Sequence, residues 1–122
     1  MKKIIISCFL ILTIIQPSFS AGSSGDSGAS KTDYEKAVKF VKQAKKYEEK
    51  GKTDKAIKRY EKAKKLLIAS NKKIPNKANT LNYLGFTTRK LGDFENGEKY
   101  YLEGLAIDPN HIGINEYLGE LY

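Results

Sequence analysis

The amino-acid sequence predicts an all-α fold in which antiparallel helix–turn–helix units are stacked into a short solenoid. Apolar residues recur at helical spacing in successive runs, and glycines stand where two of these runs end. No stretch alternates between apolar and polar residues for long enough to form a convincing strand. Short motifs also recur at regular offsets, which is typical of proteins built from repeated helical units.

The first twenty residues resemble a secretory signal peptide rather than a part of the fold. Residues 2–3 are both lysine, and residues 4–15 form an apolar run. Ser18 and Ser20 place small residues where a signal peptidase requires them, so we expect cleavage before Ala21. An uncleaved membrane anchor is the alternative, but the apolar run is shorter than the roughly 20 residues that a spanning helix needs.

Removal of this segment also removes Cys8, the only cysteine of the chain. Cys8 ends a loose match to a lipobox, but the apolar run continues past it, so a lipoprotein site is not expected. The remaining chain has 20 basic and 14 acidic residues, a net charge of +6, and has to fold without disulfides. The plain lysine- and isoleucine-rich leader looks bacterial. We therefore expect a periplasmic or secreted protein that meets the membrane only through a transient signal peptide.

The chain from residue 21 onward divides into a linker and a helical region. Residues 21–31, with the sequence AGSSGDSGASK, are rich in glycine and serine and are expected to form a flexible linker. Thr32 and Glu35 then form the two ends of a capping box, which predicts the start of a helix. Gly51 is expected to end this first helix in a left-handed conformation.

Four further helices are expected between Gly51 and the end of the chain. Apolar residues at helical spacing mark each of them. The second lies around Ala56 to Leu67 and the third around Leu81 to Leu91, where Gly92 ends it. The fourth extends from about Phe94 to Ile107 and closes at Asp108-Pro109, and the fifth begins at Ile112. Pro75 separates the second helix from the third.

The offsets between recurring motifs predict how long the helices are. Leu84-Gly85 recurs as Leu118-Gly119, 34 residues later, whereas the segment that begins at Gly51 recurs at Gly92, 41 residues later. The difference of seven residues is about two helical turns, which preserves the facing of a helix. The second helix of the first unit is therefore expected to be the longer one.

These residues and the 34-residue period make the chain similar to tetratricopeptide repeat (TPR) proteins. The repeat region would cover residues 32–122, with units at about 37–77, 78–111 and an incomplete 112–122. The matching positions are occupied by residues expected to pack the repeats together: Phe40, Ala44, Tyr47, Ala56, Tyr60, Leu81, Leu84, Gly85, Tyr101, Pro109, Leu118 and Gly119.

Small residues in this set have a physical role. Ala44, Gly85 and Gly119 are expected where the first helix of a unit closely approaches its neighbour and leaves no room for a side chain. The sequence departs from the TPR pattern at Gln43, Thr88, Gly97 and Gly104. The two glycines each cost roughly 1 kcal/mol relative to alanine inside a helix, so the fourth helix is expected to be the weakest.

Nothing in the sequence supports catalysis or a bound metal or cofactor. The chain has no GxSxG, HExxH, P-loop or GxGxxG motif. His111 is the only histidine, and a general base would need a nucleophile or a pocket beside it. Asp93, Glu95 and Glu98 cluster after a turn, where the helix dipole favours acidic residues in any case. We therefore expect a protein without enzymatic activity.

The charge is distributed unevenly. Residues 31–73 hold sixteen Lys and Arg against six acidic residues, a net charge of +10, whereas residues 74–122 hold four against seven, a net charge of −3. One interpretation is a basic module that binds an anionic envelope polymer or a lipid surface; export disfavours nucleic acid. The other is a solvated surface, and it is favoured because the basic residues of the second helix are taken to recur all round it. These residues are Lys55, Lys58, Arg59, Lys62 and Lys65.

The resemblance to TPR proteins implies a scaffold that binds a protein or peptide on the concave face made by the first helices. On this chain that face would include Val38, Val41, Lys45 and Glu48 in the first unit and Glu120 in the third. The candidate peptide contacts are Asn79, Asn82, Tyr83, Phe86, Arg89 and Glu116. Asn82, Phe86 and Arg89 share one face of a helix by their spacing. Phe86 would be either an exposed ligand contact or a residue packed on the next helix.

The third unit, residues 112–122, is expected to be incomplete. An array of TPR units needs about three units and a polar cap for stability and solubility. The segment from Ile112 to Tyr122 has few polar residues, and one of its sides would await a second helix. We therefore expect the sequence to be a fragment of a longer array. The alternative is self-association through the incomplete third repeat.

Overall fold

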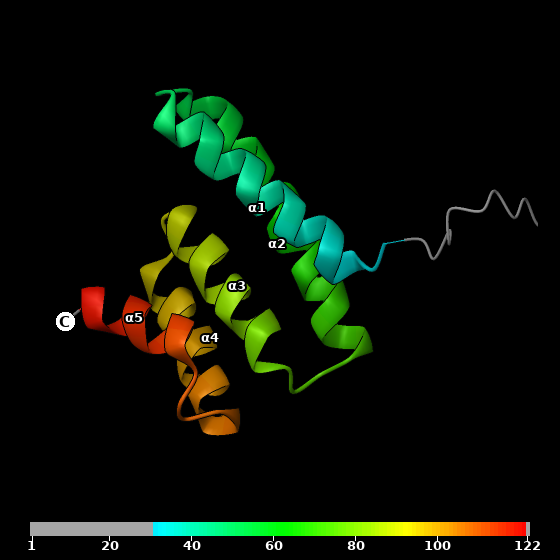
Figure 1. The fold of residues 1–122 in the computed structure, drawn as a ribbon, viewed down its shortest axis with the longest axis vertical. Coiled ribbons are helices and arrows are strands. Elements are labelled where there is room, and N and C mark those ends of the chain that lie inside the picture. Colours follow the sequence, from blue (N-terminus) through cyan, green and yellow to red (C-terminus); the bar gives the residue numbers. More distant parts are fainter. Residues whose placement is uncertain (1–30, 122) are drawn as a thin grey trace, which may run out of the picture.

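The computed structural model describes residues 31–121 of the chain, and this part is all-α (Figure 1). The expected signal peptide, its cleavage after Ser20 and residues 21–30 of the expected linker lie outside the described residues. The described part contains the helices α1 (Asp33–Glu49), α2 (Thr53–Lys73), α3 (Ala78–Lys90), α4 (Phe94–Ile107) and α5 (Ile112–Leu121), and it contains no strand. The predicted fold class and the predicted order of the helices are confirmed.

The helix ends follow the local chemistry that the sequence predicts. Thr32 Oγ1 accepts a hydrogen bond from the backbone N–H of Glu35, and the Glu35 carboxylate accepts one from the backbone N–H of Thr32. Gly51 (φ +71°) and Gly92 (φ +92°) take positive φ directly after α1 and α3, as C-terminal caps that favour glycine do. Asn76 also has a positive φ, of 63°, in the connection from α2 to α3.

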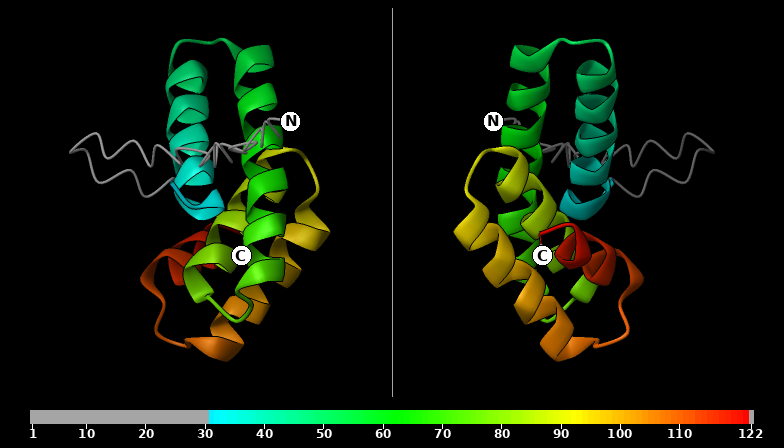
Figure 2. Two further views of the ribbon diagram at one scale, coloured as in Figure 1. Left: turned by 90° about the vertical axis from the view of Figure 1, so that its right-hand side faces the viewer. Right: turned by 90° about the vertical axis from the view of Figure 1, so that its left-hand side faces the viewer.

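The helices form two antiparallel hairpins, and α5 packs against the second of them. Helix α2 packs on both α1 and α3 and so joins the α1–α2 hairpin to the α3–α4 hairpin (Figures 1 and 2). Helix α2 has 21 residues and α4 has 14, and this difference of seven confirms the expected insertion of two turns. The end of the longer helix α2 contacts the start of α1 through an ion pair, in which Lys73 Nζ lies 2.7 Å from Asp33 Oδ2.

Glycines allow the closest approaches between α3, α4 and α5. A Cβ added to Gly97 would lie 3.1 Å from the carbonyl oxygen of Gly85, and one added to Gly104 would collide with Ile114 Cδ1. Gly97 and Gly104 therefore hold positions where α4 touches its neighbours, which adds a packing role to the propensity cost expected of them. Gly119 differs from the expectation of a close approach, because it is exposed and a Cβ there would meet nothing within 4 Å.

The core is one cluster with buried residues from every helix, and it is built largely from the positions expected to pack the repeats. Phe40 and Tyr47 are half-buried against this core, whereas Pro109 is exposed in the α4–α5 turn. Helix α5 contributes Ile114 and leaves Ile112 exposed to 75%. No helix among the described residues is long and apolar enough to cross a membrane. The expected packing residues that are buried are Ala44, Ala56, Tyr60, Leu81, Leu84, Gly85, Tyr101 and Leu118.

Candidate peptide-binding groove

Helices α1, α3 and α5 lie on one side of the molecule, nearer the viewer in Figure 1, while α2 and α4 lie behind them. A groove of about 320 Å³ opens on this side where the three helices meet. The three helices belong to different units of the expected repeat, so the groove exists only because the units are stacked. We call it the α1–α3–α5 groove, and its lining residues are Lys45, Glu48, Glu49, Phe86, Arg89, Lys90 and Tyr117.

The floor of the groove is aromatic and continuous with the core. Phe86 is only 5% exposed and packs edge-on against Tyr60 of α2, with ring centroids 5.9 Å apart. Its other neighbour is Tyr117 of α5, at 5.1 Å, and Tyr117 in turn stacks on Tyr101 of α4 at 5.6 Å. Because aromatic pairs prefer edge-on and offset geometries, these contacts stabilise the floor.

The walls of the groove carry both signs of charge. Lys45 Nζ lies 4.7 Å from the centroid of the Phe86 ring, and Lys90 Nζ lies 5.6 Å from it, so two cations flank the same ring. Lys90 also forms an ion pair of 3.1 Å with Glu48, which links α3 to α1 across the groove. Glu49 adds a second carboxylate on the α1 side. Such a site can bind a mixed polar and apolar segment rather than a polymer of a single charge.

The negative charge of Glu48 also acts on the core beneath the groove. Burial raises the pKa of the Tyr60 hydroxyl well above its usual value, and the nearby Glu48 carboxylate raises it further. Tyr60 is 1% exposed, and its hydroxyl oxygen has no partner at hydrogen-bonding distance among the described residues, so Glu48 acts on it from farther away. Tyr60 is therefore un-ionised in the folded protein at neutral pH.

Three of the six predicted contact residues have structural partners elsewhere. Asn79 Oδ1 lies 2.6 Å from His111 Nε2, and the Tyr83 ring packs edge-on against Tyr34 of α1 at 5.9 Å. Asn82 packs against the start of α5, because a Cβ on Gly113 would lie 3.0 Å from Asn82 Nδ2. These three residues hold α3 to its neighbours and do not line the α1–α3–α5 groove.

The other three predicted contact residues differ among themselves. Arg89 lines the groove, whereas Glu116 is exposed on α5 and does not line it. Phe86 lines the groove only as its buried floor, so the interpretation as an exposed ligand contact is wrong and the packing alternative is correct. The sequence alone does not distinguish these cases. Residue spacing shows which side chains share a face of a helix, but it does not show which neighbouring helix covers that face.

Sequence reasoning also missed part of the lining. Glu49, Lys90 and Tyr117 were not predicted as groove residues, although Lys45 and Glu48 were placed on the concave face. Lys90 follows Phe86 by four residues, and this spacing puts both side chains on one face of α3. This spacing is the sequence signal that could have identified Lys90 as a groove residue.

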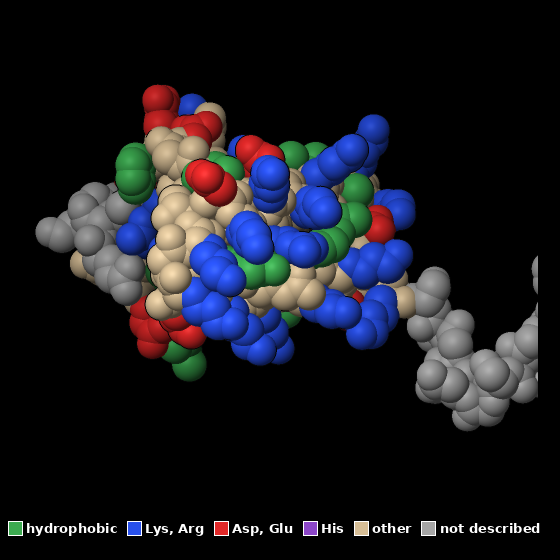
Figure 3. Space-filling view, turned by 90° about the horizontal axis from the view of Figure 1, so that it is seen from above, with side chains coloured by type: hydrophobic (Ala, Val, Ile, Leu, Met, Phe, Trp, Pro, Cys, Tyr) green, Lys and Arg blue, Asp and Glu red, His purple; other side chains and the backbone are tan. Residues whose placement is uncertain are grey.

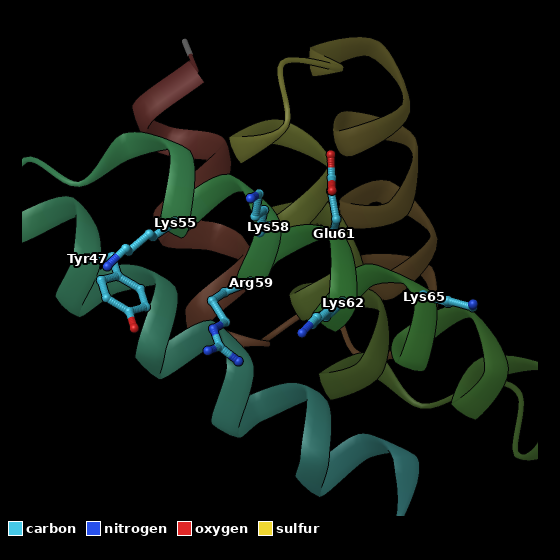
Figure 4. A pocket seen from close by; sticks show the side chains of 7 residues that line it. All are labelled: Tyr47, Lys55, Lys58, Arg59, Glu61, Lys62 and Lys65. Atoms are coloured by element: carbon cyan, nitrogen blue, oxygen red, sulfur yellow. The ribbon is translucent and has the colours of Figure 1, made fainter.

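A second groove, of about 510 Å³, lies along the outer side of α2 next to Tyr47 of α1 (Figure 4). The expectation that the basic residues recur all round α2 is wrong. Five of them share this groove, because steps of three and four residues keep side chains on one face of a helix. We call it the basic groove, and its lining residues are Tyr47, Lys55, Lys58, Arg59, Glu61, Lys62 and Lys65.

His111 has a structural role in the α4–α5 turn. Its Nδ1 accepts a hydrogen bond of 3.2 Å from the backbone N–H of Ile114, so in the neutral ring the proton lies on Nε2 and is donated to Asn79. Within residues 31–121, no group of three or more His, Cys, Asp or Glu side chains could hold a metal ion.

Comparison with known proteins identifies one part of the chain. Residues 78–111, which comprise α3, α4 and the turn that follows, match the family model of the tetratricopeptide repeat. The α3–α4 hairpin is therefore similar to a TPR unit, and the matched segment is the one expected to form the second unit. No curated protein matches the chain significantly. TPR units generally mediate protein–protein interactions and are typically non-catalytic.

Proposed function

We propose that this protein is a non-catalytic scaffold that holds a segment of a partner protein in the α1–α3–α5 groove. The TPR unit at residues 78–111 supports a role in protein–protein interaction. The single observation that carries the assignment to this groove is the Phe86–Tyr117 floor, which is set between charged walls contributed by α1 and α3. Tyr117, which is only partly buried, offers contact area on the floor, and side chains of both signs at the rim can pair with polar groups of a peptide.

The proposed place of action is the bacterial cell envelope. Support for this comes from the leader-like sequence of residues 1–20, with its lysine pair, its apolar run and its Ser18-Phe19-Ser20 motif. N-terminal sequencing of the protein recovered from the periplasm or the medium tests the proposal. A mature N-terminus at Ala21 is expected, whereas an intact Met1 on membrane-bound protein would contradict it.

The experiment that tests the scaffold is partner capture from an envelope extract, followed by direct binding of the purified partner. The groove variant is Lys45→Ala with Arg89→Ala, which changes the walls and leaves the buried Phe86 in place. The control is Lys39→Ala with Lys42→Ala, which removes the same charge from exposed positions of α1 outside the groove.

The groove variant should bind the partner about tenfold more weakly, because truncation of residues at the centre of an interface carries most of the loss. The control should bind as the wild type does, and circular dichroism should give the same helicity for both variants. Equal binding by the groove variant and the wild type would show that the partner contacts another surface, and the proposed site would then be wrong.

A further inference from the structure

We infer that the basic groove on α2 is a second binding site, which takes a linear polyanion whose negative charges are phosphate groups. The site shares no residue with the α1–α3–α5 groove, and the inference does not rest on the proposed peptide binding. It rests on the arrangement of five cations along one side of a helix, on their lack of carboxylate partners, and on the aromatic rings that position three of them.

The cations of the basic groove form a continuous row. Lys55, Lys58, Lys62 and Lys65 follow one another at steps of three and four residues, and Arg59 lies beside them. At 1.5 Å per residue the row is roughly 15 Å long. Figure 4 shows Arg59 and Lys62 pointing across the groove toward α1, whereas Lys58 and the one acidic member, Glu61, point to the other side of α2. The groove therefore offers a line of positive charge to an extended ligand.

These positive charges are not neutralised by the protein. Lys73, Lys90 and Lys99 each form an ion pair, whereas none of the five basic-groove cations forms one with another described residue. Lys and Arg predominate across the middle of the face in Figure 3. Like charges one helical turn apart destabilise a helix. Lys58 and Lys62 are such a pair, and a bound anion would relieve their repulsion.

Aromatic rings hold part of the row in place. Lys55 Nζ lies 5.8 Å from the ring centroid of Tyr47. Arg59 Cζ lies 5.6 Å and Lys62 Nζ 5.7 Å from the ring centroid of Phe40. Cations placed over a ring face are attracted by its quadrupole. Because these side chains are already positioned, an anionic ligand loses less free energy in ordering them.

The same contacts favour a phosphate polymer over other anions. The ring faces of Phe40 and Tyr47 lie under cations, so they are not open for stacking by the bases of a nucleic acid. Tyr47 is the only residue of the lining that is not charged, which leaves an acidic peptide without an apolar anchor. A phosphate group presents several oxygen acceptors and can bridge two ammonium groups one turn apart.

A row of lysines could instead serve as a polar cap over the end of the repeat array. Terminal repeats do need a polar outer face for solubility. Alternating acidic and basic residues would also make the outer face polar, and they would form stabilising ion pairs along the helix. A row of cations with a single Glu61 on its margin goes beyond what a cap needs.

The test is the binding of a short linear inorganic polyphosphate to the purified protein by calorimetry at several salt concentrations. The groove variant is Lys58→Gln, Lys62→Gln and Lys65→Gln. The control is Lys39→Gln, Lys42→Gln and Lys46→Gln, which has the same net charge and comparable spacing on exposed positions of α1 that line neither groove.

The groove variant should bind polyphosphate about tenfold more weakly. The log–log slope of affinity against salt concentration should become shallower by about two, because three lysines no longer neutralise phosphates and displace their counterions. The control should stay close to the wild type, and both variants should keep their helicity. If the control weakens as much as the groove variant, binding follows net charge alone and the inference is overturned.

Three further ligands distinguish the sources of negative charge. A polyglutamate peptide and a single-stranded oligonucleotide with the same number of charges should bind more weakly than polyphosphate. Vesicles of anionic lipid should not compete with polyphosphate for the groove. Tighter binding of either polymer, or binding of vesicles alone, would overturn the inference in favour of an acidic protein, a nucleic acid or a membrane surface.

Discussion

The ring of Tyr101 in α4 lies directly against the backbone of Gly85 in α3. A Cβ on residue 85 would be 2.5 Å from both Cδ1 and Cε1 of that ring. Tyr101 is fully buried and stacks on Tyr117, so its ring has no room to withdraw. The TPR unit therefore depends on the absence of one side chain at this position.

Gly85→Ala should destabilise the fold by about 1–3 kcal/mol, because an added methyl group in a filled core forces the neighbouring residues apart. Gly119→Ala is the matched control. A Cβ at Gly119 meets nothing within 4 Å, and alanine is the better helix former, so this variant should be neutral or up to about 1 kcal/mol more stable. Urea denaturation measures both changes. Equal stability of the two variants would contradict the close approach at Gly85.

Gly51 provides a test of the turn between α1 and α2. Its φ of +71° is in the left-handed region, where an L-residue with a Cβ is disfavoured. Gly51→Ala should cost about 1 kcal/mol of unfolding free energy. Gly51→Asn should cost less, because asparagine tolerates this conformation better than alanine does. Thermal melts of the two variants check the order, and a less stable asparagine variant would show that φ is not the cause.

The capping box at the start of α1 should contribute measurably to stability. Thr32→Ala removes the acceptor for the backbone N–H of Glu35 and should cost about 1 kcal/mol. Glu35→Ala removes the reciprocal acceptor for the N–H of Thr32. The two losses should not add in the double variant, since both bonds close the same turn. Strict additivity in denaturant titrations would show that the two bonds act independently.

Asp33 should make folding sensitive to acid. A hydrogen bond from Lys73 holds the pKa of the Asp33 carboxyl below its usual value. A group whose pKa is lowered by folding stabilises the fold above its usual pKa, and this contribution disappears as the pH falls through the lowered value. Asp33→Asn should therefore match the wild type in strong acid and be less stable at neutral pH. A constant stability difference across this range would rule out the pair as the cause.

Tyr60 should limit stability in alkali. Burial raises the pKa of its hydroxyl, so the unfolded chain ionises first and stability falls as the pH rises above about 10. Tyr60→Phe should remove this part of the alkaline loss. At neutral pH it should change the unfolding free energy by no more than about 1 kcal/mol, because no described residue lies within hydrogen-bonding distance of the hydroxyl and Glu48 acts on it only from farther away. A large loss at neutral pH would indicate a hydrogen bond to this hydroxyl.

Local signals account for most of what the sequence predicts correctly. The capping box at Thr32 and the left-handed caps at Gly51 and Gly92 depend on residues within one turn of each other. The offset of seven residues predicted the two additional turns of α2 because helical phase is a property of a single helix.

Contacts between helices are what the sequence does not show. Gly97 and Gly104 were judged by helix propensity alone, but α3 and α5 approach α4 at these positions. Phe86 was a candidate ligand contact on a face that Tyr60 and Tyr117 cover. The row of cations on α2 is a different kind of error, since the spacing from Lys55 to Lys65 already predicted a single face.

The separation of charge between the two parts of the chain has a consequence for how the molecule meets its partners. Residues 31–73 carry a net charge of +10 and residues 74–122 a net charge of −3, so the protein has a large electric dipole moment. In the field of an anionic polymer this dipole experiences a torque that turns the α1–α2 end forward before any contact forms. Diffusional encounters are then biased toward productive orientations, most strongly at low ionic strength, where the field reaches farthest from the surface.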